Sequence, residues 1–173
     1  MVKLRPMISV RALVLALAFF ILGPVSETMA ACTDPPGPEV NWRRCVFDRL
    51  PLNAVDLTAA ELRDASFFRA DLSATVLNNV SAFRAKFVNA TLSEASFVEA
   101  NLQEADLTKA DLSDANLKAA DLRRARLFRA NLRGADLTDA RLEGADLAQA
   151  DLSGVTWTDG ERVCAEGSIG RCN

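Results

Sequence analysis

Cysteines and recurring carboxylates are the side chains of this sequence with the most chemical potential. The chain of 173 residues contains four cysteines and 23 acidic residues, but no histidine and no tyrosine. Without histidine, the commonest general base and the commonest metal ligand are both missing. The carboxylates recur at a regular spacing, so none stands apart as a catalytic acid or base would. We therefore expect no enzymatic activity and no cofactor.

A series of polar residues spaced by twenty raises the question of a metal site. It contains Asp71, Asp111 and Asp151, with Thr91 and Asn131 between them. Asp and Asn side chains cap tight turns by accepting hydrogen bonds from nearby backbone N–H groups. The sequence also lacks the Gly-rich spacing of calcium-binding β-roll repeats. We interpret these residues as turn caps and predict no metal site.

The four cysteines all follow residue 31, and an even number in an exported chain predicts disulfides. Four cysteines allow three pairings. We favour Cys32–Cys45 and Cys164–Cys172, which would staple one end of the chain each. In an alternative interpretation the segment 29–32 (MAAC) resembles a lipoprotein cleavage box, and Cys32 would be lipidated.

The first 31 residues have the three parts of a secretory signal peptide. Basic residues come first, an apolar run of eleven follows at 12–22, and small residues lie near position 30. As an uncleaved anchor this run would be short, because a membrane span needs about 20 residues. We predict cleavage, a periplasmic or secreted protein, and no integral membrane span afterwards. The remaining chain has 17 basic and 22 acidic residues, which does not indicate nucleic-acid binding.

Large apolar residues recur at every fifth position from Phe47 to Trp157. Of these 23 positions 21 are Leu or Phe, and Ala lies two residues earlier without exception from Ala85 to Ala150. A step of five rotates a side chain by about 140° on a helix, so the leucines would not share one face. In a strand, an odd step places alternate leucines on opposite faces. The chain must therefore turn once per repeat, as a solenoid does.

The unit A-[D/N]-L-x-x resembles that of the pentapeptide-repeat family, and the resemblance covers residues 45–159. We identify the chain as an exported bacterial member. The resemblance implies an all-β fold, a right-handed quadrilateral β-helix with four repeats per coil and about six coils. Residues 32–44 would form a Pro-rich N-terminal tether and cap, and residues 160–173 a C-terminal cap.

With four repeats per coil, residues twenty apart stack. We therefore predict one inner column of stacked rings from Phe47, Phe67 and Phe87. The one irregular core position is Ala82, where a missing Leu side chain would leave a hole. We expect either that Phe83 compensates or that the backbone bulges there.

The outward positions beside this column predict a candidate binding face. An apolar ladder would lie next to a basic ladder, and an acidic column on the opposite side would include Glu99 and Asp139. The residues of the candidate face are Phe68, Val88, Phe128, Arg49, Arg69, Lys109 and Arg129. An apolar patch with basic flanks suits a protein partner or a second copy of the chain. The alternative is that Phe68 and Phe128 are isolated exposed rings without a role.

We therefore expect a non-catalytic structural or protein-interaction module of the bacterial periplasm or cell envelope. The resemblance also suggests an alternative, because the family includes acidic rods that imitate DNA and protect gyrase. An acidic DNA-mimic inhibitor or protector of a nucleic-acid enzyme would have to remain in the cytoplasm. Basic residues are also expected to interrupt any continuous acidic face.

Overall fold

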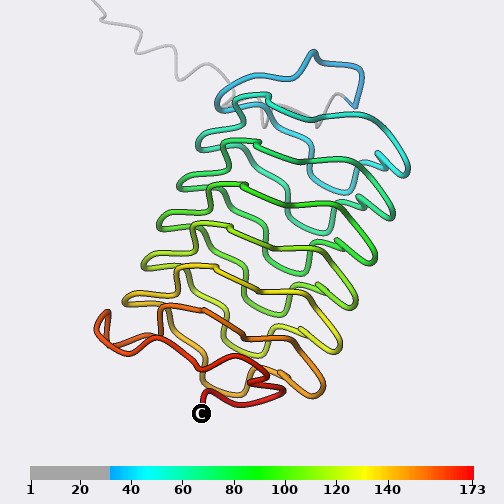
Figure 1. The fold of residues 1–173 in the computed structure, drawn as a ribbon. Helices are drawn as coiled ribbons and strands as arrows, with labels where there is room; N and C mark the ends of the chain where they lie inside the picture. Colours follow the sequence, from blue (N-terminus) through cyan, green and yellow to red (C-terminus); the bar gives the residue numbers. More distant parts are fainter. Residues whose placement is uncertain (1–31) are drawn as a thin grey trace, which may run out of the picture.

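The computed structural model describes residues 32–173 as a rod of stacked coils (Figure 1). The predicted signal peptide lies outside these residues. Isolated parallel β-bridges join each paired residue to the one twenty positions later, from Asn41↔Glu61 to Asp136↔Thr156. Because the sequence repeat is five residues, each coil contains four repeats and the rod has four sides. No helix among the described residues is long and apolar enough to cross a membrane.

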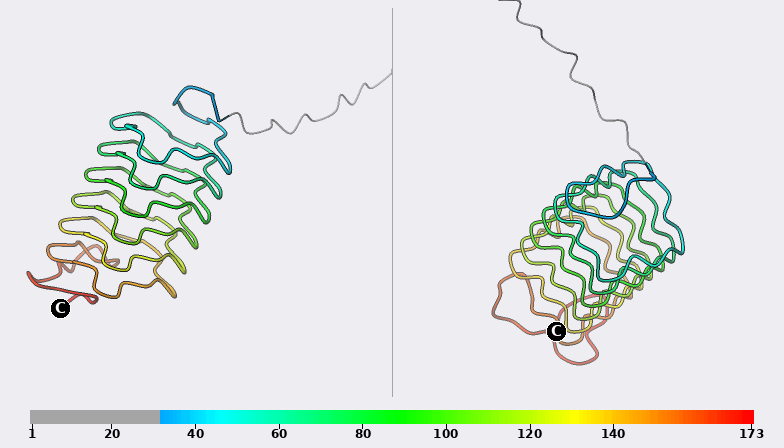
Figure 2. Two further views of the ribbon diagram at one scale, coloured as in Figure 1. Left: turned by 90° about the vertical axis from the view of Figure 1, so that its right-hand side faces the viewer. Right: turned by 90° about the horizontal axis from the view of Figure 1, so that it is seen from above.

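We number the four sides by the first buried residue on each. Side 1 begins with Trp42, side 2 with Phe47, side 3 with Leu52 and side 4 with Leu57. Each later residue on a side lies twenty positions further along the chain, directly over the preceding one. Figure 2, in its view from above, shows the coils superimposed in this way.

A tight turn in every repeat closes the square. The N–H of Ala65 donates to the carbonyl of Leu62 (3.0 Å), and this bond recurs at the corners along the rod. The residue before the donor has a positive φ, for example 57° at Asp64 and 56° at Arg69. This left-handed conformation is what bends the chain after every fifth residue, and it overrides the helix propensity of Ala, Leu and Arg.

Three further backbone bonds per repeat join neighbouring coils, as at Leu62 N–H to Ser81 carbonyl (2.8 Å). One N–H per repeat takes no part in these backbone bonds, and it belongs to the residue after the buried Leu. An Asp or Asn side chain two positions earlier accepts from it, as Asp71 Oδ1 does from Ser73 N–H (3.0 Å) and Asp111 from Ser113 N–H (3.1 Å). The interpretation of these residues as turn caps is confirmed.

Leu, Phe and Ala side chains fill the inside of the rod. The predicted ring column is confirmed on side 2, where the ring centroids of Phe47 and Phe67 are 5.5 Å apart. Those of Phe67 and Phe87 are 5.2 Å apart, with planes 6° from parallel. Stacked aromatic pairs of this kind contribute about 0.5–1.5 kcal/mol beyond their burial.

Both expectations for Ala82 are wrong. The ladder runs through Ser81 without a bulge, and Phe83 points outward beneath the guanidinium of Arg63 rather than into the core. In the same coil Phe97 replaces the usual Leu and meets Phe87 edge to face at 6.2 Å. We infer that this larger side chain offsets the volume missing at Ala82, because filling a layer costs less than a persistent hole.

The N-terminal end begins earlier than the sequence predicts. The ladder starts at Asn41 rather than at residue 45. Trp42 is 1% exposed, and its Nε1–H donates to the carbonyl of Asp34 (3.3 Å). The predicted Cys32–Cys45 disulfide ties this loop to the first coil. The loop therefore covers the top of side 1.

Pro51 occupies a place in the first coil that proline could not take in the middle of the rod. One coil later, the N–H of Asp71 donates upward to the carbonyl of Leu50 (3.0 Å). Among the described residues no coil lies above Pro51 on side 3, so the missing N–H removes no bond between them. Proline at such an edge prevents further strand pairing.

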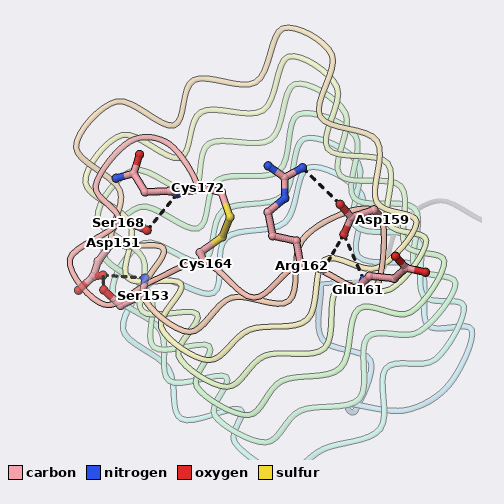
Figure 3. Close-up of a disulfide and its surroundings, with 9 residues drawn as sticks. Asp151, Ser153, Asp159, Glu161, Arg162, Cys164, Ser168 and Cys172 are labelled. Carbon is pink, nitrogen blue, oxygen red and sulfur yellow. Dashed lines mark hydrogen bonds and ion pairs between the residues drawn. A yellow bond between two sulfur atoms is a disulfide. The ribbon is translucent and has the colours of Figure 1, made fainter.

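The C-terminal end has a different cap, held by the predicted Cys164–Cys172 disulfide. The chain reverses after Trp157 and pairs antiparallel with the last coil, through Thr156↔Val163 and Asp151↔Ile169. Figure 3 shows this end, with the disulfide between Asp151 on side 3 and Asp159 on side 4. The cap thus lies on sides 3 and 4.

Candidate functional site

The structure places all seven residues of the predicted binding face on side 2. Backbone bonds between successive coils align them, from Arg49 N–H to Phe68 carbonyl (2.9 Å) and from Arg69 N–H to Val88 carbonyl (3.1 Å). Lys109 N–H donates in the same way to the carbonyl of Phe128 (2.9 Å). The apolar residues therefore form one column and the basic residues a second column beside it, because the turn repeats without change.

The two outward rings on side 2 are half-buried rather than freely exposed. The guanidinium of Arg69 lies 5.0 Å from the ring centroid of Phe68. Arg129 lies over Phe128 at the same distance. Both Arg side chains start from the left-handed residue next to the ring, and this position lets the guanidinium fold back over it. Such cation–π contacts at exposed sites contribute about 0.5–1 kcal/mol each.

Thr108 interrupts the apolar column between Val88 and Phe128. Its N–H donates to Asp106 Oδ1 (3.1 Å), but its buried Oγ1 has no hydrogen-bond partner among the described residues. On side 4, by contrast, the hydroxyl of Thr58 donates to Asp56 (2.6 Å). A buried hydroxyl without a partner costs about 1–3 kcal/mol. Between Phe68 and Phe128 the apolar column therefore contains one buried polar atom that destabilises it.

Sequence reasoning did not identify the charge pattern of side 1. Its left-handed positions alternate in charge, and Arg84 lies between Asp64 (3.8 Å) and Glu104 (3.9 Å). Arg124 continues the series at 3.8 Å from Glu104. A shallow, open depression of about 230 Å³ lies over this side, lined by Gln103, Glu104, Arg123, Arg124 and Glu143. Sampling the sequence every twenty residues would have revealed the alternation.

Charge is divided between the two pairs of neighbouring sides. Sides 3 and 4 carry ten carboxylates and only two cations, Lys118 and Arg133, whereas side 2 carries six cations and three carboxylates. The six cations are Arg49, Arg69, Lys86, Lys109, Arg126 and Arg129. Lys118 and Arg133 interrupt the acidic residues of sides 4 and 3 at one position each, and the other basic residues of the rod lie on sides 1 and 2.

Six of the ten carboxylates on sides 3 and 4 accept local hydrogen bonds from backbone N–H groups. They are Asp56, Asp71, Asp111, Asp136, Asp151 and Asp159. The Ser153 hydroxyl donates to Asp151 and lowers the pKa of that carboxyl. Arg123 donates to both oxygens of Asp121 on side 1 and lowers its pKa likewise. Among the described residues no three His, Cys, Asp or Glu side chains are grouped as metal ligands. The carboxylates that accept these bonds satisfy backbone N–H groups at the turns.

Comparisons with known proteins agree with this geometry. The family model for pentapeptide repeats matches residues 85–124 and 125–156, with eight copies. None of the curated proteins is similar enough to this chain to count as a relative.

Solved structures similar to this chain are pentapeptide repeat proteins. HetL, involved in heterocyst differentiation regulation in the cyanobacterium Nostoc sp. strain PCC 7120, is 30% identical over 71% of this chain, with a TM-score of 0.47. The match covers 64% of HetL. Rfr23 from the cyanobacterium Cyanothece 51142 is 27% identical over 68% of this chain and 90% of its own, with a TM-score of 0.44.

QnrB1, a plasmid-mediated fluoroquinolone resistance protein, is 19% identical over 75% of this chain and 74% of its own. Its TM-score of 0.52 supports a similarity of fold alone. The five-residue turn, the twenty-residue ladder and the repeat match from 85 to 156 have one common explanation. This chain belongs to the pentapeptide-repeat family.

Proposed function

We propose that the chain is an exported, non-catalytic interaction module whose side 2 binds a protein partner. The observation that carries the proposal is the pair of aligned columns on side 2, apolar and basic, on a backbone held by bonds between every coil. A rigid rod presents such columns without losing backbone conformational entropy on binding, and preorganisation of this kind favours affinity. The proposal takes the rod to be a right-handed quadrilateral β-helix of about six coils.

Export is supported by the two disulfides, which persist in oxidising compartments. The proposed order of the chain is a signal peptide at 1–31, an N-terminal tether and cap, the repeats, and a C-terminal cap at 160–173. Cleavage would leave a periplasmic or secreted protein. The proposal includes no cofactor and no nucleic-acid ligand.

The chemistry of side 2 defines the partner. Guanidinium groups stacked on Phe68 and Phe128 keep one face free for carboxylates, since Arg can stack and donate hydrogen bonds at the same time. Lys86 and Lys109 add point charges nearby. We therefore propose a partner with an acidic surface that also has apolar side chains. Sides 3 and 4 of a second copy are acidic surfaces of this kind, so the partner in a homodimer would be a second copy of the chain.

The test is affinity capture from the native envelope with residues 32–173 as bait. The double variant Phe68→Ser/Phe128→Ser should reduce the captured partner at least about tenfold, which corresponds to about 1.4 kcal/mol of binding free energy. Val98→Ser, on side 4, is the matched control and should capture the partner normally. Equal capture by both variants would refute the proposal. A large drop in stability of the double variant would show instead that the rings are structural.

The segregation of acidic residues favours one second candidate, a DNA-mimic inhibitor or protector of a nucleic-acid enzyme. Sides 3 and 4 form two neighbouring acidic surfaces, with Glu94 and Asp114 twenty residues apart on side 3. Such a protein would remain with its target in the cytoplasm. Cell fractionation separates the candidates, because recovery of the chain in the periplasm with both disulfides formed would exclude this one.

A further inference from the structure

The C-terminal end of the rod is covered on two sides only. On sides 3 and 4 the cap accepts the outward N–H groups of the last coil. Leu152 N–H donates to Ser168 (2.8 Å), Gly154 N–H to Cys164 (2.9 Å) and Trp157 N–H to Arg162 (2.7 Å). The cap segment that satisfies these three donors pairs antiparallel with the coil at Val163 and Ile169, with a turn between them at Gly167 (φ 80°).

On sides 1 and 2 the equivalent donors have no partner among the described residues. One coil earlier, Leu122, Arg124 and Leu127 donate to Arg141, Glu143 and Asp146 at 2.8–3.1 Å. In the last coil the corresponding groups are the N–H groups of Leu142, Gly144 and Leu147, for which no hydrogen bond is formed within residues 32–173. We call residues 141–149 the open edge.

The side chains of the open edge are as incomplete as its backbone. Leu122, Ala125 and Leu127 are 0–1% exposed in the coil above. Leu142, Ala145 and Leu147 occupy the same positions and are only half-buried. A solenoid that ends in this way leaves its last core layer in water, which is why terminal repeats need a cap.

Residues 170–173 do not cover sides 1 and 2. Gly170 N–H donates to the carbonyl of Ala150 (2.8 Å), directly after the last residue of the open edge. The tail then turns back, because Cys172 is bonded to Cys164 and the N–H of Asn173 donates to Ser168 Oγ (3.2 Å). Figure 3 shows the disulfide holding Cys172 above Cys164. The staple therefore ends the cap after two sides.

We propose that the open edge binds an extended peptide segment of a partner protein by antiparallel strand addition. The cap shows that this edge pairs with an antiparallel segment. About six residues would follow 142–147 and bend once where the edge turns at Gly144 (φ 74°), because Gly170 already lies against residues 147–149. Backbone carbonyls of the peptide would face Leu142, Gly144 and Leu147, and its apolar side chains would cover the exposed leucines. The inference uses a different surface from side 2 and does not depend on the proposed function.

A single strand fits this place better than a second rod. The cap projects one strand layer beyond the last coil, about 4.8 Å. Two rods meeting end to end would be held apart by their caps, so their open edges could not pair directly. The space left over sides 1 and 2 has the depth of one extended segment.

The experiment uses residues 32–173 with both disulfides and a synthetic peptide with the sequence of residues 161–170 in which Cys164 is replaced by Ser. Within the chain, the segment with this sequence accepts hydrogen bonds from the equivalent donors on sides 3 and 4. At saturating peptide, amide hydrogen exchange followed by NMR should slow about tenfold or more at Leu142, Gly144 and Leu147. Unchanged exchange at these amides would overturn the proposal.

The variant Leu142→Lys/Leu147→Lys places charges on the edge and should abolish this protection. Val163→Lys, at a cap residue that is 61% exposed, is the matched control and should retain it. Exchange at Leu122 and Leu127 reports whether each variant is folded. Protection that survives in the double variant would refute the proposal.

Two further peptides, N-methylated on odd or on even residues, give a test that needs no variant. In a strand the N–H groups of alternate residues point to opposite edges. If the peptide pairs through one edge, only the peptide methylated on that edge should lose binding. If the amides become protected without peptide as protein concentration rises, the occupant is a second copy and the proposal is wrong.

Discussion

The two halves of the rod have the same backbone but are held together differently. Residues 41–99 contain the ring column, the edge-to-face pair of Phe87 and Phe97, and the irregular core position Ala82. The corner residues of this half include Val55, Thr75 and Val80. Residues 100–157 repeat Ala and Leu almost without change, and most of the Asp and Asn caps with a bond to the backbone lie there. These caps are Asn101, Asp106, Asp111, Asn116, Asp121, Asn131, Asp136, Asp146 and Asp151.

The comparison shows that the ladder tolerates variation in the core as long as each layer is filled. The bridges keep the same spacing in both halves, because the bonds between coils involve only backbone atoms. The N-terminal half relies more on aromatic packing and the C-terminal half more on turn caps. Four predictions test this difference.

The largest effect is expected for Phe67→Ala, which removes the middle ring of the column. Phe67 is 0% exposed and stacks on both Phe47 and Phe87, so the loss should be about 3–5 kcal/mol of unfolding free energy. The matched change on the same side of the other half is Leu127→Ala, at about 2–5 kcal/mol. Denaturant unfolding of both variants measures the difference, and a smaller effect at Phe67 would contradict the assignment of the halves.

The change Ala82→Leu restores the repeat and should nevertheless destabilise the protein by about 1–3 kcal/mol. The layer is already filled by Phe97 and by Val80, which is 1% exposed. Adding Phe97→Leu to the same chain should recover most of the loss. An increase in stability from Ala82→Leu alone would mean that a hole exists beside Ala82.

Acid should unfold the C-terminal half first. Bonds from Arg123 lower the pKa of Asp121 and those from Ser153 lower that of Asp151. At Asp136 partial burial opposes the shift, yet bonds from Thr138 and Lys118 lower the pKa. A lowered pKa in the folded state stabilises the protein above the unfolded value of about 3.9, and this contribution is lost as pH falls through the folded value.

We therefore expect NMR signals of residues 100–157 to weaken below about pH 4 before those of the N-terminal half. The variant Asp136→Asn should reduce this dependence on pH, because Asn accepts the same backbone bond without titrating. Simultaneous loss of signals from both halves would show that the caps do not distinguish them.

The smallest effect is expected for Thr108→Val, which should stabilise the protein by about 1 kcal/mol. It removes the buried Oγ1 that lacks a partner and makes the apolar column of side 2 continuous. Thr138→Val is the control, since its hydroxyl donates to Asp136 and its loss should destabilise. A destabilised Thr108→Val variant would indicate that its hydroxyl finds a partner in solution.

Much of the site could be predicted because the repeat sets the geometry. A period of five with four repeats per coil places Phe68, Val88 and Phe128 in one column, and the same rule pairs Phe47 with Phe67. The cysteine pairs followed from their positions at the two ends. These features depend on spacing along the chain, and spacing is what a sequence shows directly.

Other features depend on contacts between positions that the repeat does not relate. Phe97 fills the space beside Ala82 from another side of the same coil, so the nearest residue in sequence, Phe83, was the wrong choice. The covering of Phe68 by Arg69 depends on side-chain conformations. The open edge exists because a disulfide turns the tail back after two sides of the last coil. The sequence by itself determined the ladder and its columns, since these follow from periodicity; tertiary structure decided how layers are filled and where the end stays open, because both depend on which surfaces are left without a neighbour.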